Sequence, residues 1–328
     1  MMSKQISPAE TADWLEKRDN FLIITHKRPD GDTIGSGGAI TQVLREQGKT
    51  AYMLTNPEIT PRYLRFVENY FAPDDFNPDN IIAVDTASAE LFPKNAGKYT
   101  NSISLCIDHH GSNAFYADLT CLDADSASCG EVIFDILTAM KNTLSSTTAE
   151  LLYVALSTDT GCFSFGNTTA NTLKVASLLV EAGAPNKELN KLLFRTKTQS
   201  RIAIEGMLTA GIEYSFDNMV AIASITADML KSSQADEDDL EDIAALPSSI
   251  EGVNIGITIR ELKSPHDCKI SVRTRAPYDA QKICAFFGGG GHKLAAGATI
   301  EKSIPEIKQM LQEVLKNICQ GDGSPDIF

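Results

Sequence analysis

The stretch FLIITHKRPDGD, residues 21–32, joins an apolar segment directly to a cluster of polar side chains. Its first part, FLIIT (21–25), is a predicted strand, and such an apolar run is typical of a parallel strand that is covered on both faces. His26, Asp30 and Asp32 follow this predicted strand with the spacing His-x-x-x-Asp-x-Asp. Doubly wound α/β sheets bind their ligands beyond the carboxyl ends of the strands, so the stretch predicts both this fold and a functional site.

Three further polar clusters follow predicted strands or helices in the first half of the chain. In chain order they are Asp85-Thr86 after IIAV (81–84), Asp108-His109-His110 after ISLCI (103–107), and Ser157-Thr158-Asp159-Thr160-Gly161 at the end of a helix predicted at 147–157. The alternation of apolar strands with helices predicts an α/β protein whose N-terminal domain has a doubly wound, mainly parallel sheet. Because the strand ends of such a sheet converge on one crevice, we expect the four clusters to meet there.

Histidine and carboxylate side chains gathered in one crevice favour the binding of divalent metal ions. The carboxylates that would meet there are those of Asp30, Asp32, Asp85 and Asp159. They would cost several kcal/mol unless cations offset their charge. Imidazole and carboxylate without thiolate suit Mn²⁺ or Mg²⁺ better than structural Zn²⁺, and pairs of such ions are typical of enzymes that hydrolyse phosphate esters. Each cluster alone has a simpler explanation, such as a helix cap at Asp85, but their combination favours a site for two divalent cations.

The second half of the chain predicts a smaller α/β domain. Its expected strands lie near 210–214, 219–225, 255–262 and 268–274, and its expected helices near 237–245, 279–286 and 303–318. We divide the chain into an N-terminal metal-binding domain at 1–190, a helical connector at 191–207 and a substrate-binding domain at 208–328.

A run of four glycines followed by histidine, residues 288–292, predicts a phosphate-binding segment in the second domain. Consecutive glycines carry a high conformational entropy cost, which is justified where backbone N–H groups must approach an anion closely. His292 would then donate a hydrogen bond to the same phosphate. Arg273 and Arg275 lie two positions apart in a predicted strand and face the same side, where an arginine can bind a phosphate through two hydrogen bonds.

The composition restricts the class of partner. Among the 328 residues there are 29 Lys and Arg against 43 Asp and Glu, a net charge of −14, so an extended basic surface for long nucleic acid is not expected. No apolar segment reaches the roughly 18 residues needed to span a membrane, and the N-terminus lacks the pattern of a secretory signal. The seven cysteines include no CxxC pair, which argues against disulfides and structural zinc. We therefore expect a cytoplasmic protein with a small anionic substrate and with neither a membrane nor long nucleic acid as partner.

Taken together, these motifs resemble the DHH phosphoesterase superfamily. The motifs that carry the resemblance are HKRPDGD (26–32), VDT (84–86), DHH (108–110) and STDTGCFSF (157–165). The segment GGGGHKLAAG (288–297), with SVRTR (271–275) before it, is similar to the DHH-associated C-terminal domain of that superfamily. The two-domain size and the last of the four motifs are most similar to the NrnA-type oligoribonucleases, the nanoRNases that also dephosphorylate 3′-phosphoadenosine 5′-phosphate (pAp).

The resemblance implies a role for each candidate residue. One metal ion would be held by His26, Asp30 and Asp85, and the other by Asp32, Asp85, His109 and Asp159, so that Asp85 bridges the two. Asp108 would orient an imidazole, and His110 would face the substrate phosphate or the leaving group, which makes Asp85, Asp108 and His110 the catalytic set. In the second domain, the substrate would be bound by Ser271, Arg273, Gly289, Gly290, Gly291 and His292.

The implied activity is that of a metal-dependent phosphodiesterase with two divalent ions, Mn²⁺ or alternatively Mg²⁺. It would release 5′-mononucleotides from very short RNA and convert pAp to AMP, and a homodimer is left open. The alternatives within the superfamily are a cyclic or linear dinucleotide phosphodiesterase and a pyrophosphatase. A non-catalytic nucleotide-binding regulator would be favoured by a missing metal ligand, and none is missing. A dinucleotide-dependent oxidoreductase is disfavoured because no predicted strand opens into GxGxxG, and residues 35–38 lie inside a predicted helix at 34–47.

Overall fold

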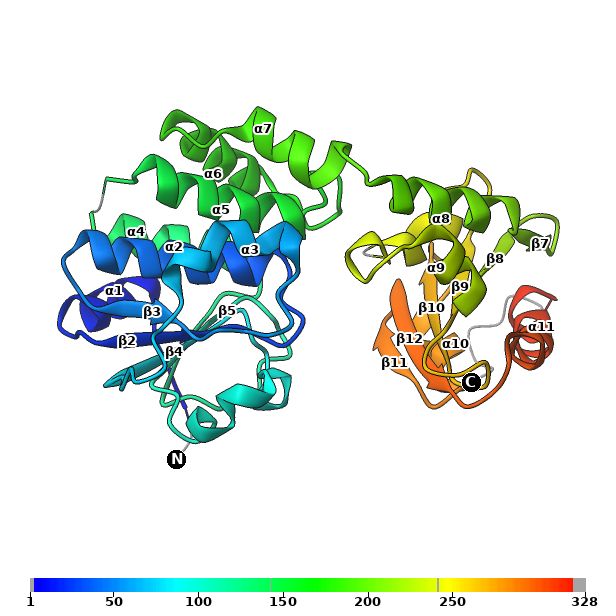
Figure 1. Ribbon diagram of the computed structural model, residues 1–328, viewed down its shortest axis with the longest axis horizontal. Helices are drawn as coiled ribbons and strands as arrows, with labels where there is room; N and C mark the ends of the chain where they lie inside the picture. The colour runs from blue at the N-terminus through cyan, green and yellow to red at the C-terminus, as the bar shows by residue number, and fades with distance from the viewer. Residues whose placement is uncertain (1–2, 142, 241, 321–328) are drawn as a thin grey trace. The chain divides into compact units, whose positions relative to one another are not determined.

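The computed structural model describes residues 3–141, 143–240 and 242–320, and it divides into two compact units (Figure 1). The first unit extends to Thr196 and the second begins at Lys197. Each unit has its own six-stranded sheet and its own hydrophobic core. Among the described residues, no helix combines the length and the apolar character that crossing a membrane requires.

The first unit contains a sheet in which every pair of neighbouring strands is parallel. Its strands are β1 (Lys4–Gln5), β2 (Phe21–Ile24), β3 (Ala51–Met53), β4 (Asn80–Val84), β5 (Leu105–Asp108) and β6 (Leu119–Leu122). Their order across the sheet is β1-β6-β5-β4-β2-β3. The chain passes outward from β2 to β3 and then returns to β4 on the other side of β2. Strand order therefore reverses between β2 and β4, and this reversal is where doubly wound sheets place their ligands.

The helices of the first unit gather on one side of this sheet (Figure 1). They are α1 (Pro8–Glu16), α2 (Gly31–Glu46), α3 (Pro61–Val67), α4 (Cys129–Ala139), α5 (Ser146–Asp159), α6 (Ala170–Glu181) and α7 (Asn186–Asn190), the last continuing as a π-helical turn at Lys191–Arg195. Short 3₁₀ turns at Ala89–Leu91 and Lys94–Tyr99 belong to the segment whose Phe92 and Ala96 cover the other face. The structure confirms the predicted α/β class with a parallel N-terminal sheet.

Glycines let α2 and α4 lie against the backbone of α5. A Cβ atom on Gly35 would be 2.4 Å from the carbonyl oxygen of Leu151 and 2.7 Å from the backbone nitrogen of Ala155. A Cβ on Gly130, in α4, would be 2.7 Å from the Cβ of Ala155. The glycines at 35–38 therefore belong to a helix, as predicted, and Gly35 allows α2 to approach the middle of α5.

Substituting Gly35 by alanine is expected to destabilise the first unit by about 2–4 kcal/mol, since the α5 backbone cannot move without repacking the core. For a unit of this size, the thermal midpoint should fall by about 4–12 °C. Calorimetry of the full chain measures this shift. Gly97→Ala is the matched control, because a Cβ atom at Gly97 would have no heavy atom within 4 Å. Its thermal midpoint should stay within about 2 °C of the wild-type value. Equal midpoints for the two variants would contradict the packing argument.

The second unit contains a mixed sheet in the order β11-β12-β10-β9-β8-β7. Its strands are β7 (Glu213–Ser215), β8 (Val220–Ile225), β9 (Ile255–Glu261), β10 (Cys268–Thr274), β11 (Gly290–His292) and β12 (Ala295–Ile300), and only the pair β8–β9 is parallel. Its helices are α8 (Gln199–Ala210), α9 (Ala227–Ser233), α10 (Ala280–Ala285) and α11 (Ile304–Gln320). Helices α10 and α11 pack on one face of the sheet, and α8 packs with β8 on the other.

Two predicted elements of the second unit differ from the structure. The strand predicted near 210–214 starts too early, because α8 continues to Ala210 and β7 occupies Glu213–Ser215. The predicted helix at 237–245 is replaced by 3₁₀ turns at Asp238–Leu240 and Ile243–Ser249. Within the first turn, the Asp239 carboxylate accepts hydrogen bonds from the side chains of Thr198 and Ser200, so it stabilises the start of α8 instead of a new α-helix.

Candidate metal centre

A cavity of about 490 Å³ lies at the carboxyl ends of β2, β4 and β5. Its walls include every predicted metal ligand except Asp32, and they also include His110. Lys27 and Arg28, which the sequence analysis did not assign to the site, also line this cavity. The reversal of strand order thus places the candidate residues where the sheet topology predicts a ligand.

The first group of candidate ligands consists of His26, Asp30 and Asp85. The Nε2 atom of His26 lies 3.7 Å from Asp30 Oδ1 and 3.8 Å from Asp85 Oδ2. These distances are too long for hydrogen bonds, whereas two atoms that bind one cation at about 2.1 Å are separated by roughly 3–4 Å. The Nδ1 atom of His26 is 2.8 Å from the carbonyl oxygen of Lys27. A proton on Nδ1 would be donated to that oxygen, which leaves the Nε2 lone pair for a metal ion.

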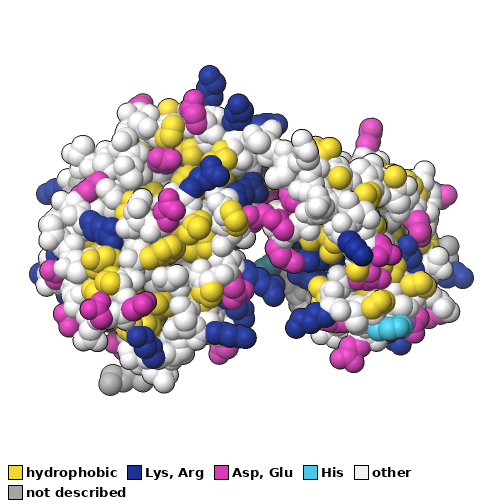
Figure 2. All heavy atoms as spheres, viewed as in Figure 1, with side chains coloured by type: hydrophobic (Ala, Val, Ile, Leu, Met, Phe, Trp, Pro, Cys, Tyr) yellow, Lys and Arg dark blue, Asp and Glu magenta, His cyan; other side chains and the backbone are white. Residues whose placement is uncertain are grey.

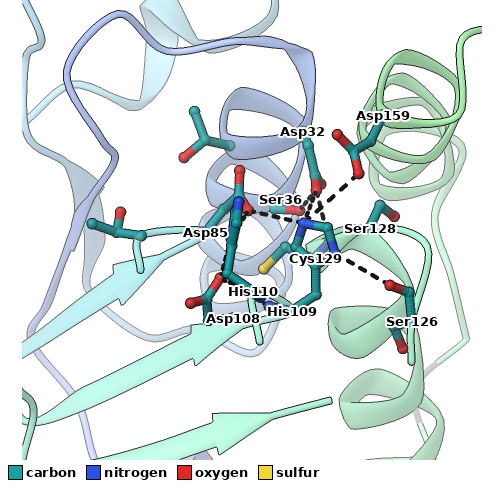
Figure 3. Close-up of polar contacts among 12 residues, drawn as sticks. Asp32, Ser36, Asp85, Asp108, His109, His110, Ser126, Ser128, Cys129 and Asp159 are labelled. Carbon is teal, nitrogen blue, oxygen red and sulfur yellow. Dashed lines mark hydrogen bonds and ion pairs between the residues drawn. The ribbon is translucent and has the colours of Figure 1, made fainter. Parts of the chain in front are cut away.

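The second group consists of Asp32, His109 and Asp159, and Figure 3 shows all three pointing toward one another. His109 Nε2 lies 3.7 Å from Asp32 Oδ2 and 3.7 Å from Asp159 Oδ2. The other ring nitrogen, Nδ1, is 3.2 Å from the carbonyl oxygen of Ser126, so this histidine is oriented in the same way as His26. Asp159 is the last residue of α5. A carboxylate is unfavourable at that end of a helix dipole, and a nearby cation would remove the penalty.

Asp85 lies between the two groups and faces both of them. Its Oδ2 is directed at His26, and its Oδ1 lies 3.6 Å from His109 Nε2. The side chain is buried, yet Oδ1 has no hydrogen-bond partner among the described residues. The backbone of Asp85 has a φ of +53°, which is uncommon for a non-glycine residue and often marks a functional site. A buried carboxylate oxygen without a hydrogen-bond partner among the described residues fits a metal ligand shared by the two groups.

The N-terminus of α4 holds Asp32 in place (Figure 3). The Oδ2 atom of Asp32 accepts a hydrogen bond of 2.7 Å from the backbone nitrogen of Cys129, and Oδ1 accepts one of 3.1 Å from that of Gly130. The hydroxyl of Ser36 donates a third, 2.9 Å long. A carboxylate is stabilised at this end of a helix, so Asp32 is fixed before any cation arrives.

Electrostatics in this crevice oppose ionisation of all the carboxylates at once. Burial raises the pKa of Asp32 well above its ordinary value, and the charges of Asp159 and Asp30 raise it further. Burial likewise raises the pKa of Asp85, with added repulsion from Asp32 and Asp30. Burial also raises the pKa of Asp159. Burial also opposes ionisation of Asp30, but the contact with His26 and the backbone hydrogen bonds from Thr33 and Asp32 together outweigh it and lower the pKa. The residues therefore fit divalent cations, which would relieve this repulsion.

Asp108 and His110 form a pair beside the two groups. The Asp108 Oδ1 atom is 2.8 Å from His110 Nδ1, and it also accepts a hydrogen bond of 2.8 Å from the backbone nitrogen of His109. Burial opposes ionisation of Asp108, but hydrogen bonds from His110 and Asn113 outweigh it and lower the pKa. The hydrogen bond to Asp108 raises the pKa of His110. The Nε2 atom of His110 is left for the cavity, which this side chain lines.

Sequence reasoning missed several residues that shape this site. Asn113 contacts Asp108, and the carbonyl of Ser126 contacts His109. Both groups lie in loops, and no sequence spacing indicates them. Lys27 and Arg28 lie within the motif HKRPDGD (26–32). Their positive charges next to the candidate ligands indicate a site for a phosphate group, because cations attract phosphate. The Lys27 ammonium donates a hydrogen bond of 3.0 Å to the carbonyl of Glu90.

In the second unit, four predicted substrate-binding residues share one face of the sheet. Arg273 and His292 are both paired with Ala295, on opposite sides of β12. Ser271 and Gly290 are in the same way both paired with Gly297. Residues directly opposite each other in antiparallel strands project to the same face. The residues between them on β12, Ala295 and Gly297, are small.

Gly289 and Gly291 have a packing reason to be glycine. A Cβ on Gly289 would be 2.3 Å from the carbonyl oxygen of Gly297, and one on Gly291 would be 2.6 Å from the Cα of Ala296. Gly290 would meet no heavy atom within 4 Å. Gly289 and Gly291 therefore allow β11 to approach β12, whereas Gly288 and Gly290 each have open space on the side where a Cβ would stand.

Three features define the class of DHH phosphoesterases. They are the parallel sheet, the two groups of imidazole and carboxylate side chains on either side of Asp85, and the smaller second sheet. The chain belongs to the DHH family. The model of the DHH family, N-terminal domain, matches residues 20–156, and that of the DHHA1 domain matches residues 217–319. The resemblance seen in the sequence motifs is thereby confirmed.

Similar proteins extend this relationship over nearly the whole chain. The bifunctional oligoribonuclease and PAP phosphatase NrnA of Thermus thermophilus is 31% identical over 302 residues, which cover 91% of this chain and 89% of that protein. The protein of the same name from Bacillus subtilis is 28% identical over 309 residues, with coverages of 92% and 95%. The crystal structure of an exopolyphosphatase-related protein from Bacteroides fragilis has a TM-score of 0.84 at 23% identity, covering 95% of this chain and 97% of that one. This last likeness shows a common fold.

Proposed function

We propose that this protein is an exoribonuclease that hydrolyses very short RNA to 5′-mononucleotides and also converts pAp to AMP. The observation that carries the proposal is Asp85, whose two buried oxygens face two separate groups of candidate ligands. Relatives named as oligoribonuclease and PAP phosphatase, similar over about nine-tenths of the chain, support this substrate class. All seven cysteines are free thiols, as is usual in the reducing cytoplasm, where we place the enzyme.

Two divalent cations, preferentially Mn²⁺, complete the proposed active site. One would be held by His26, Asp30 and Asp85, and the other by Asp32, Asp85, His109 and Asp159. When bound, such ions offset negative charge on the phosphate and make water nucleophilic near neutral pH. The oxygen and imidazole ligands without thiolate support Mn²⁺ or Mg²⁺.

His110 is the proposed general acid. Asp108 holds its Nδ1 atom and raises its pKa, so the protonated ring is favoured near neutral pH. From Nε2, His110 would donate a proton to the ribose 3′-oxygen as that oxygen leaves the phosphate. The same transfer serves pAp, in which the ribose 3′-oxygen is again the leaving group.

The second unit would bind the rest of the substrate. Arg273 offers a planar guanidinium that binds a phosphate through two hydrogen bonds, and His292 lies in the same row of side chains. Ser271, Gly290 and the tightly packed Gly289 and Gly291 complete this proposed surface. On both units, acidic and basic side chains are interspersed over the face seen in Figure 2. Together with the net charge of −14, this distribution favours short substrates over long polyanions.

A substrate panel tests the proposal. With Mn²⁺, kcat/KM for the dinucleotide pApA should exceed that for a 20-residue RNA by at least about 100-fold, equivalent to roughly 2.7 kcal/mol, and pAp should be converted to AMP. Cyclic di-AMP and pyrophosphate complete the panel. Equal rates on the two RNA lengths would show a general exonuclease, and turnover of only cyclic di-AMP or pyrophosphate would support the corresponding alternative. The Asp85→Asn protein, purified in parallel, controls for contaminating nucleases.

A further inference from the structure

We infer that Asn113 is a positioning residue that fixes the His110 ring by way of Asp108. Asn113 follows the DHH motif by three residues, and its side chain is only 8% exposed. Its Nδ2 atom donates a hydrogen bond of 2.6 Å to Asp108 Oδ2. The inference deepens the proposed function and rests on it, because His110 is the group that would touch the substrate.

The two oxygens of Asp108 have separate partners. Oδ1 accepts from the backbone nitrogens of His109 and His110, at 2.8 and 3.2 Å, and lies 2.8 Å from His110 Nδ1. Oδ2 is reached by Asn113 from the other side. A carboxylate is planar and its terminal torsion is broad, so contacts on both oxygens are needed to fix its plane. Asn113 supplies the contact that stops Asp108 from rotating away from the imidazole.

Fixing Asp108 also decides which carboxylate the imidazole contacts. His110 Nδ1 lies 2.8 Å from Asp108 but only 3.5 Å from Asp85 Oδ1, the buried oxygen that has no hydrogen-bond partner among the described residues. A small rotation of the ring would transfer its hydrogen bond to Asp85. That transfer would occupy the Asp85 oxygen that faces His109 and turn Nε2 away from its present direction. Asn113 therefore keeps His110 on Asp108 and keeps Asp85 free.

The chain leaves the Asn113 amide one useful orientation. Its Oδ1 accepts a hydrogen bond of 2.7 Å from the backbone nitrogen of Phe115, so the amide oxygen is fixed and the NH₂ group must face Asp108. The backbone nitrogen of Asn113 donates to the carbonyl of His110 at 3.0 Å, and that of Ala114 donates to Ala87 at 2.8 Å. Since Ala87 lines the cavity, the loop is tied to the wall of the site.

Asn113→Asp is the most direct test, because it keeps the shape and the acceptor for Phe115 but replaces the donor to Asp108 by a second carboxylate. With pApA, we expect kcat to fall about 10- to 100-fold, with KM within twofold of the wild-type value. Asn113→Ser, a milder change, should give a smaller fall in the same direction and remains informative if the Asp variant folds poorly.

Histidine ¹⁵N spectra of the Mg²⁺-loaded full chain provide a readout that does not require turnover. In the wild type, we expect Nδ1 of His110 to keep its proton whether or not Nε2 is protonated, with the signal assigned by its loss in His110→Gln. In the Asn113 variants this signal should shift toward a mixture of ring states. A wild type that fails to hydrolyse pApA would count against the proposed function, while the spectra would still report whether Asn113 fixes His110.

Asn56→Asp is the matched control. Asn56 is also buried, its Oδ1 also accepts from the backbone nitrogen two residues later (Glu58), and its Nδ2 donates 2.8 Å to the carbonyl of His26. We expect this variant to lose stability but to keep the wild-type His110 signal. The inference is overturned if the folded Asn113 variants retain that signal and a kcat within twofold of wild type, whatever their stability.

Discussion

Replacing Asp85 by asparagine is expected to lower turnover of pApA at least about a thousandfold while stabilising the metal-free protein. The loss in turnover follows because one substitution weakens both ligand groups, which together supply several kcal/mol of charge stabilisation, and each 1.4 kcal/mol is a factor of ten in rate. The gain in stability follows because the buried carboxylate is repelled by Asp32 and Asp30. Asparagine also tolerates the left-handed backbone at this position. Steady-state kinetics and chemical unfolding in a chelator measure the two effects.

The stability gain should depend on pH in a defined direction. Burial and repulsion raise the folded-state pKa of Asp85 above its unfolded value, so the folded wild type binds this proton more tightly. The resulting stabilisation is complete below about pH 4, the unfolded pKa, and is lost as the pH rises through the folded pKa. Asparagine does not ionise, and the advantage of the variant should therefore grow to about 1–3 kcal/mol toward pH 8.

The control for this variant is Asp118→Asn, which changes an exposed aspartate of the same unit and should leave kinetics and stability unchanged. Wild-type turnover in Asp85→Asn would refute the two-metal assignment. A variant that is less stable than wild type at pH 8 would refute the account of carboxylate repulsion.

Titration of the chelator-treated protein with Mn²⁺ is expected to show two sites per chain. At a free concentration of 100 times Kd, each site adds about 2.7 kcal/mol to the free energy of unfolding. For a unit of this size, two sites should raise the thermal midpoint by about 10–20 °C. Calorimetric titration and thermal unfolding provide the two measurements.

His26→Ala should leave a single site, because His26 belongs to the first ligand group alone. His266→Ala, which removes an exposed histidine of the second unit, is the matched control and should retain two. One site in the wild type, or an unchanged count in His26→Ala, would contradict the division into two groups.

The strands at the centre of the first sheet were predictable because their physical signal is local. β2, β4 and β5 are continuously apolar and end directly at polar residues. β6 was not predicted, because Thr120 interrupts the apolar run of LTCL, and the segment forms a strand by pairing with β5 along Leu105–Asp108. Helix α2 begins at Gly31 instead of residue 34, since Asp30 caps it through the backbone nitrogens of Asp32 and Thr33.

The candidate ligands were predictable because they stand at the ends of recognisable strands and helices. The residues that hold them and Asp108 in place, Asn113 and Ser126, were not predictable. Each ligand follows the end of a strand or helix, and sheet topology alone brings those ends together. Asn113 and Ser126 act through loops whose closure depends on distant contacts, such as that of Ala114 with Ala87. The left-handed backbone of Asp85 also has no signature in the sequence. For the glycine run, the sequence predicts an anion site, but it does not predict the close approach of β11 to β12, which depends on how the two strands pack.

The lengths of the outermost strands have a consequence for behaviour at high concentration. The four strands at the sheet edges are β1, β3, β7 and β11, and each has only two or three residues, whereas the interior strands have four to seven. Unpaired edge groups are templates on which other chains add strands, and very short edges are one way that proteins prevent this. Self-association through the sheets is therefore disfavoured, and an insertion that lengthens β1, β3 or β7, the edges outside the proposed substrate-binding surface, should promote aggregation before it impairs catalysis.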